Sequence, residues 1–213
     1  MIDARMFTVG PVQENCFIVR AKDSPRAVII DPGEEAERLL QAIAALGIEA
    51  IEAILITHTH FDHIGAVAPV AKATRAPVYC PELETQVLAN IMDYVPWPGF
   101  GPFESYDADH TVAGGDTLEL AGLTLDVLFT PGHSPGHVTY AITDQNALFS
   151  GDVLFQGSVG RVDLPGGDWE TLLASIESLT NAFPPDATVH PGHGPLTTLR
   201  RELATNPFLR ELA

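Results

Sequence analysis

One short segment of the sequence is rich in side chains that bind metal ions. Residues 58–63 read His-Thr-His-Phe-Asp-His, so three histidines and a carboxylate fall within six positions. This clustering serves no packing purpose, whereas imidazole and carboxylate groups together suit Zn²⁺, Fe²⁺ or Mn²⁺. His58 and His60, two residues apart in an extended segment, point the same way, and Asp62 and His63 begin the next helical run. We therefore expect this segment to face two adjacent metal ions.

Three further polar residues occur in glycine-containing turns that follow apolar runs. They are His133 in TPGHSPGH, Asp152 in FSGD and His193 in HPGHG. Catalytic side chains commonly lie at strand ends of a rigid scaffold. His137 and His190 lie beside these residues, and we expect them to support the ligands through hydrogen bonds or to end strands rather than to bind metal.

These motifs resemble those of the metallo-β-lactamase-fold hydrolase superfamily. The resemblance is narrower to the short bacterial branch that is similar to glyoxalase II, a hydroxyacylglutathione hydrolase. It covers nearly the whole chain and rests on residues 57–63, 131–134, 150–152 and 191–194, with residues 157–167 as a weaker match.

The resemblance implies an α/β (α+β) fold, a four-layer αββα sandwich, which we expect to form a single domain over residues 1–213. It also implies two divalent metal ions. One would be held by His58, His60 and His133, the other by Asp62, His63 and His193, with Asp152 bridging the two. Zinc is the metal that we expect, with iron or manganese as alternatives, and Asp62 and Asp152 are the catalytic carboxylates of this hypothesis.

The chain departs from the larger glyoxalase II enzymes, which continue into a C-terminal helical domain whose basic and tyrosine side chains hold glutathione. Here only about twenty residues follow His193. Arg161 is the one basic residue that the motifs place near the metal ions, so a substrate carboxylate would bind there. An ion pair between Arg161 and Asp163 that fixes the loop is an equal alternative.

The elements that must position these residues follow from hydrophobic periodicity. We predict a helix between Glu34 and Gly47, a helix behind an Asp168 N-cap, and a long surface loop over 94–109. The predicted strands are 6–9, 16–20, 27–30, 51–57, 117–120, 123–129, 138–143, 147–149 and 188–190. Two facing sheets with helices outside would bury all the apolar faces.

Composition excludes several classes of function. The chain has 213 residues, 46% of them hydrophobic, and 28 acidic against 11 basic residues, for a net charge of −17. Without a basic stripe, nucleic acid and anionic membranes are poor partners. No apolar stretch approaches a membrane span and the N-terminus lacks the pattern of an export signal, so we expect a cytoplasmic protein. Cys16 and Cys80 are expected to be buried and reduced.

The chemistry that this set of residues favours is hydrolysis of a small thioester, such as S-lactoylglutathione, by a metal-bound hydroxide. A thiolate leaves without obligatory protonation, whereas an amide or β-lactam nitrogen needs a proton donor. An iron-dependent persulfide dioxygenase needs only two histidines and an aspartate, so the motifs leave it open. A lactonase or other ester hydrolase is a further alternative. A non-enzymatic metal module is disfavoured, because structural zinc sites are closed.

Overall fold

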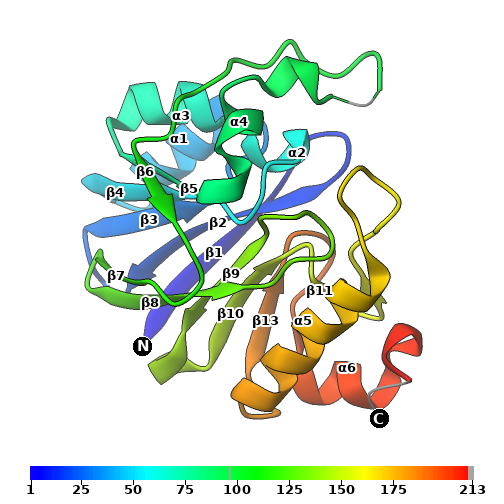
Figure 1. The fold of residues 1–213 in the computed structure, drawn as a ribbon. Helices are drawn as coiled ribbons and strands as arrows, with labels where there is room; N and C mark the ends of the chain where they lie inside the picture. The colour runs from blue at the N-terminus through cyan, green and yellow to red at the C-terminus, as the bar shows by residue number, and fades with distance from the viewer. Residues whose placement is uncertain (96, 211–213) are drawn as a thin grey trace.

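Two β-sheets lie face to face at the centre of the computed structural model, which describes residues 1–95 and 97–210 (Figure 1). The first sheet contains, in spatial order, β1 (Ile2–Val9), β2 (Glu14–Ala21), β3 (Arg26–Ile30), β4 (Ala50–Leu55), β5 (Val78–Pro81) and β6 (His110–Val112). The second contains β14 (Thr197–Thr198), β13 (Thr188–Pro191), β10 (Ala147–Gly151), β9 (Val138–Ile142), β8 (Leu123–Phe129) and β7 (Thr117–Leu120). A separate short pair contains β11 (Leu154–Phe155) and β12 (Ser158–Val159).

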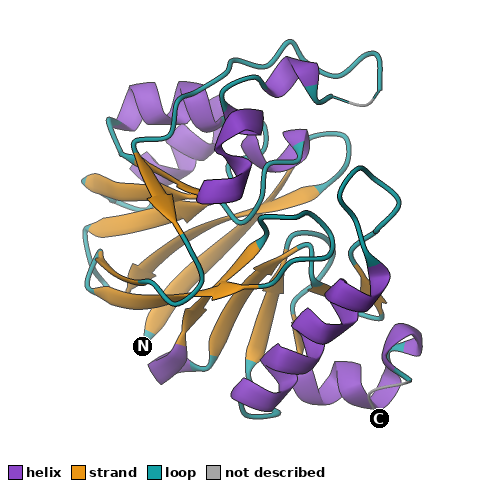
Figure 2. Cartoon of the chain, viewed as in Figure 1, coloured by secondary structure: helices purple, strands orange, loops and turns teal. Residues whose placement is uncertain are grey.

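Helices cover the outer face of each sheet (Figure 2). The first sheet is covered by α1 (Ala36–Ala45) and α3 (Val67–Thr74), and the second by α5 (Trp169–Ala182) and α6 (Leu199–Thr205). The short helical turns are α2 (Phe61–Ile64), η1 (Glu82–Glu84), α4 (Thr85–Leu88), η2 (Ile91–Asp93), η3 (Thr143–Gln145) and η4 (Pro207–Leu209). This is the four-layer αββα sandwich that the sequence predicted. Among the described helices, none is both long and apolar enough to cross a membrane.

The layers follow from strands that are apolar on both faces. Along β2, Cys16 and Ile18 belong to the core under the helices of the first sheet, whereas Phe17 and Val19 belong to the core between the sheets. Side chains alternate in direction along a strand, so one run of apolar residues supplies both cores. A third core lies between the second sheet and α5. Cys16 and Cys80 are buried and unpaired with each other, as predicted.

Most predicted elements are present, with differences at their ends. The first strand begins at Ile2, and its early residues pair with the end of β2 although they are only partly buried. Asp168 caps α5 as predicted, since its carboxylate accepts the Thr171 N–H at 2.8 Å. Hydrophobic periodicity does not indicate α3, β5 or the terminal α6, because each is short and lacks a clear apolar period.

Tyr140 links the two sheets. Its side chain is buried between them, and its hydroxyl donates to the carbonyl of Ile56 at 2.9 Å. Tyr140→Phe keeps the ring but leaves that buried carbonyl without a donor. We expect the free energy of unfolding to fall by about 1–3 kcal/mol in denaturant titrations. Tyr106→Phe, which removes an exposed hydroxyl bonded to Asp109, is the control and should cost clearly less; equal losses would contradict the assignment.

His190 also lies between the sheets, stacked on Phe149 with ring centroids 4.5 Å apart. Burial lowers the pKa of His190 to about 4. In the unfolded chain the same imidazole binds a proton near pH 6.5, so acid favours unfolding. The contribution of neutral His190 to the free energy of unfolding is therefore complete above about pH 6.5 and is lost as the pH falls toward about 4. His190→Phe keeps the stack and cannot titrate. Between about pH 7.5 and 4.5 the wild type should lose about 2 kcal/mol more unfolding free energy than the variant; parallel pH profiles would refute this.

Candidate metal centre

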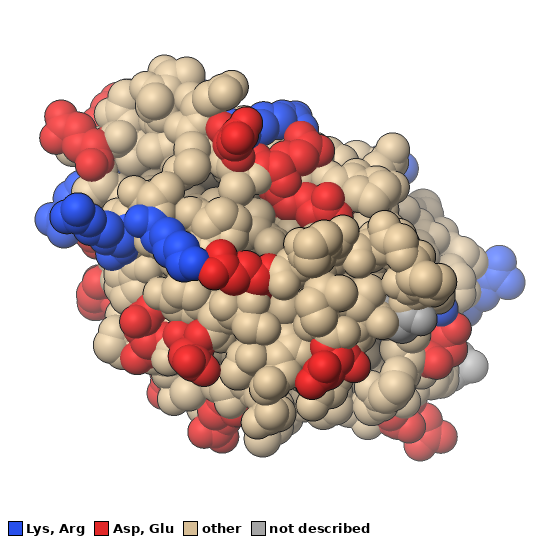
Figure 3. Space-filling view, turned by 90° about the horizontal axis from the view of Figure 1, so that it is seen from above, with Lys and Arg blue, Asp and Glu red and all other residues tan. Residues whose placement is uncertain are grey.

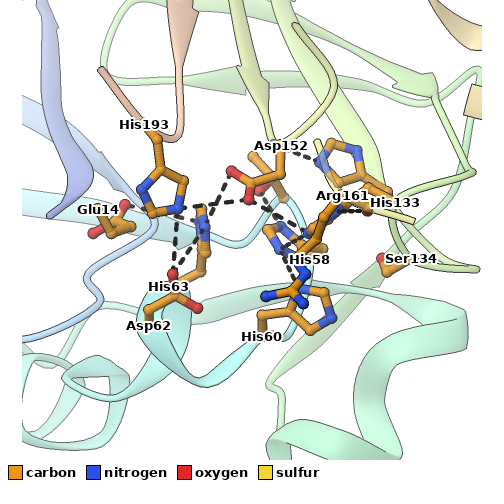
Figure 4. A network of polar contacts seen from close by, with 12 residues as sticks. Glu14, His58, His60, Asp62, His63, His133, Ser134, Asp152, Arg161 and His193 are labelled. Carbon is orange, nitrogen blue, oxygen red and sulfur yellow. Dashed lines mark hydrogen bonds and ion pairs between the residues drawn. The ribbon is translucent and has the colours of Figure 1, made fainter. Parts of the chain in front are cut away.

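Four loops meet at one edge of the sandwich, where strands of both sheets end (Figure 4). Residues 58–63 follow β4 and His133 follows β8. Asp152 comes directly after β10, and His193 lies two residues beyond β13. The seven residues expected to bind metal therefore come together, although they are as much as 135 positions apart (193 − 58).

Three imidazoles form the first group, which we call the three-histidine set: His58, His60 and His133. The Nε2 atom of His58 lies 3.1 Å from Nδ1 of His60 and 3.2 Å from Nε2 of His133. Nitrogen ligands at ~2.0–2.1 Å from a tetrahedral zinc ion lie about 3.3 Å apart. The ring nitrogens therefore have the spacing of ligands around one small cation.

The second group, the mixed set, combines Asp62, His63 and His193. Oδ2 of Asp62 lies 3.3 Å from Nε2 of His193 and 3.9 Å from Nε2 of His63. Asp62 and His63 belong to α2, so this one turn directs a carboxylate and an imidazole to the same place. His193 completes the set from the second sheet.

Asp152 lies between the two sets. Its Oδ1 atom is 3.3 Å from Nε2 of His63 in the mixed set. Its Oδ2 atom is 3.4 Å from Nε2 of His133 in the three-histidine set and 3.5 Å from Nε2 of His193. A single carboxylate thus faces both groups of donors.

The donor atoms fit divalent cations. Nε2 of His63 and Oδ1 of Asp152 are buried, and neither has a hydrogen-bond partner among the residues that the structure describes. Buried polar atoms in folded proteins nearly always have a partner, and a cation between the sets would supply one to both. Imidazole nitrogens mixed with carboxylate oxygens suit zinc, iron and manganese.

The electrostatics favour the protonation states that ligands need in the three-histidine set and in Asp152, but not in the imidazoles of the mixed set. Burial, with the neighbouring imidazoles, lowers the pKa of His58 well below its ordinary value and that of His60 to about 4, so both are neutral at pH 7. Burial would raise the pKa of Asp152, but His63 and His193 lower it. Neutral imidazole and ionised carboxylate are the forms that bind metal. Burial would lower the pKa values of His63 and His193, but the Asp152 carboxylate raises both above the ordinary value, so each must release a proton when a cation binds.

Residues behind the two sets fix their orientation. Asp31 accepts from the Thr57 N–H at 2.7 Å, the Thr57 hydroxyl at 2.6 Å and Nδ1 of His63 at 3.0 Å. His137 accepts the Asp152 N–H through Nε2 at 3.1 Å, so its Nδ1 donates to the Thr130 hydroxyl at 3.0 Å. The ring of His190 instead packs against Phe149 and Phe17 between the sheets.

Two residues near the mixed set could not be identified from the sequence, and one of them, Asn15, holds the loop of His193. Asn15 donates through its side chain to the carbonyls of Pro191 at 3.1 Å and Gly194 at 2.7 Å, and its N–H donates to Gly192 at 2.7 Å. Glu14 is fully buried, lies 3.8 Å from Nδ1 of His63, and burial raises its pKa well above the ordinary value. No local pattern marks either residue, because their partners are far away in sequence.

A cavity of about 610 Å³ opens beside the two sets. Its walls are largely aromatic and aliphatic, and include Phe61, Val87, Tyr94, Trp97 and Leu164. Within the predicted 94–109 loop, of which residue 96 lies outside the described residues, Phe100 and Phe103 pack on Phe61 at centroid distances of 4.8 and 5.8 Å.

Arg161 lines the same cavity. Its guanidinium forms a two-point ion pair with Asp163 at 2.6 and 2.7 Å and lies over the Trp97 ring, 5.5 Å from the centroid. Its backbone carbonyl accepts from Nδ1 of His133 at 2.7 Å. The loop ion pair, one of the two alternatives from the sequence, is therefore present, while contact with a substrate stays a prediction for a residue that lines the cavity.

The surrounding surface is predominantly acidic. Figure 3 shows carboxylates spread over one face of the molecule, with the basic side chains in a few separate groups. Several basic side chains of the protein are paired with carboxylates, as Arg38 is with Glu35 at 2.8 Å and Lys72 is with Glu104.

Comparisons with known proteins agree with this geometry. The family model for the metallo-β-lactamase superfamily matches residues 9–193. A Bacillus subtilis (strain 168) protein described as a probable metallo-hydrolase, YqgX, is 41% identical over 210 residues, 96% of each chain. The hydroxyacylglutathione hydrolase GloC of Haemophilus influenzae is 34% identical and covers 98% of each chain.

Two solved structures are similar over almost the full length. The BLEG-1 B3 metallo-β-lactamase has a TM-score of 0.90 and 41% identity, and the match covers 99% of this chain and 100% of that one. The protein TTHA1623 in a di-iron-bound form has a TM-score of 0.85 and 43% identity, with 96% and 100% covered. The present chain therefore belongs to the metallo-β-lactamase superfamily and is one of its metallo-hydrolases.

Proposed function

We propose that this protein is a binuclear metal-dependent hydrolase that cleaves a small thioester, with residues 1–213 acting as one domain. The observation that supports this proposal is the pair of facing donor sets that share Asp152. The three-histidine set would hold one divalent ion and the mixed set the other. Bound there, two such ions supply a water of lowered pKa as nucleophile and polarise the acyl carbonyl.

The chain's own residues would do the remaining work. Asp62 and Asp152 present carboxylate oxygens at the mouth of the cavity, where Asp152 spans both sets and fixes their separation. The apolar walls exclude bulk water from the reacting acyl group. Arg161, which lines the cavity and pairs with Asp163, would exchange that partner for a carboxylate of the substrate.

The substrate class is supported from two sides. GloC, a hydroxyacylglutathione hydrolase, is similar over the whole chain. A thiolate also leaves without a dedicated acid, and none of the described residues that line the cavity is a lysine. We propose S-lactoylglutathione as the test substrate.

Hydrolysis of a β-lactam is the second candidate, because the BLEG-1 B3 metallo-β-lactamase shares 41% of its residues with this chain. Zinc is the metal that we propose, while TTHA1623 shows that a similar scaffold binds two iron ions. Iron would also be the metal of the persulfide dioxygenase alternative, and the same assays can test a lactone as substrate.

Metal content and activity should be measured on one preparation. We expect two metal ions per chain and loss of thioester absorbance with S-lactoylglutathione, with a β-lactam run beside it. Asp152→Ala should lower the second-order rate constant about 100-fold or more and reduce bound metal. Asp144→Ala, an exposed carboxylate in η3, is the matched control. The proposal would be refuted if Asp152→Ala lost its metal but kept wild-type turnover. It would also be refuted if the protein held one iron per chain and consumed O₂ with glutathione persulfide.

Arg161→Ala tests the substrate contact separately. The variant keeps the backbone carbonyl that binds His133, so metal binding should not change. We expect KM for S-lactoylglutathione, which bears carboxylates, to rise about tenfold with little change in kcat. A neutral thioester of a short thiol should show no such rise. Equal effects on both substrates would mean that Arg161 only fixes its loop.

A further inference from the structure

We propose that Glu84 is a positioning residue that sets the spacing of the three-histidine set. The inference rests on the proposed function, because the metal ligands are themselves proposed. Glu84 ends η1, immediately beyond β5, and is only 4% exposed. A carboxylate is rarely buried to this extent without specific partners.

Four donors surround the Glu84 carboxylate. Oε1 accepts from the Ser134 hydroxyl at 2.7 Å and the Gly136 N–H at 2.8 Å. Oε2 accepts from the Thr59 N–H at 3.3 Å and from the Thr59 hydroxyl. The group therefore functions as an acceptor at both oxygens, which an ionised carboxylate does and an amide cannot.

The close approach depends on a glycine. A Cβ at Gly136 would lie 2.6 Å from Cγ of Glu84 and 2.9 Å from its Oε1. Any side chain at that position would push the carboxylate away from the loop. The absence of a side chain at Gly136 therefore allows its backbone N–H to reach the Glu84 carboxylate.

The partners of Glu84 adjoin the proposed ligands. Thr59 lies between His58 and His60 after β4 of the first sheet, and Ser134 directly follows His133 after β8 of the second. One carboxylate therefore joins the two segments that must come together to form the three-histidine set.

His60 depends most on this link. The outward Nδ1 of His58 contacts the Thr57 hydroxyl at 3.1 Å, and that of His133 contacts the Arg161 carbonyl at 2.7 Å. Within the described part of the chain, the ring of His60 has no such bond, and its one hydrogen-bonding contact is to His58. Its position is therefore set by the backbone that Glu84 holds through Thr59.

Glu84→Gln tests the role, with Glu82→Gln, an exposed residue of the same turn, as the matched control. Metal-free proteins are titrated with Co²⁺ and followed by visible absorbance, which differs between a site of three imidazoles with the shared Asp152 carboxylate and a site of two imidazoles with two carboxylates. We expect the wild type and Glu82→Gln to bind two ions. Glu84→Gln should weaken the site of the three-histidine set about 10- to 100-fold and leave the other unchanged. Thermal unfolding of each protein without metal shows whether the variants are folded.

Ser134→Ala keeps the carboxylate and removes one donor, so it decides the question if Glu84→Gln does not fold. It should weaken the same site about 2- to 10-fold. Wild-type affinity in both variants, or equal weakening of the two sites, would overturn the inference while the proposed function stood. A wild-type protein that binds no Co²⁺ would overturn the proposed function itself.

Discussion

Buried polar atoms at the edge of the sandwich impose the constraint on which the rest of the structure depends. Imidazoles and carboxylates taken out of water must be paired, because an unpaired buried polar group costs free energy. Here each donor set faces inward, and the protein binds the outward Nδ1 atoms of three of the imidazoles, those of His58, His63 and His133. Asp31 accepts three hydrogen bonds and His137 positions the backbone of Asp152. Within residues 1–95 and 97–210, the inward Nε2 of His63 and Oδ1 of Asp152 have no hydrogen-bond partner, and a cation between the sets would supply one.

The two-sheet architecture makes this arrangement possible. Residues 58–63 follow β4 of the first sheet, whereas His133, Asp152 and His193 follow strands of the second. The inter-sheet core, together with the bond from Tyr140 to Ile56, fixes one sheet against the other next to the loops. Displacement of a sheet would therefore alter the distances between the donor sets, so packing far from the site contributes to its geometry.

The cavity beside the donor sets is the part of the site that can distinguish one substrate from another. Related proteins of similar length include a hydroxyacylglutathione hydrolase and a B3 metallo-β-lactamase. The donor sets are compatible with either reaction, since both substrates have an acyl carbonyl. What differs between substrates must be recognised by the cavity walls, where the pair of Arg161 with Asp163 and the ring of Trp97 lie. A common fold does not by itself specify a substrate.

The sequence by itself determined the seven candidate ligands and most strands, because ligand clusters, glycine turns and apolar periods are local patterns. It also indicated the αββα layers, because strands that are apolar on both faces must be covered by a second sheet on one side and by helices on the other. Only the tertiary structure decided that Glu84 and Asn15 hold the loops and that His190 packs between the sheets. A buried glutamate or asparagine has no distinguishing local pattern, since its role is defined by donors and acceptors that folding brings from distant segments.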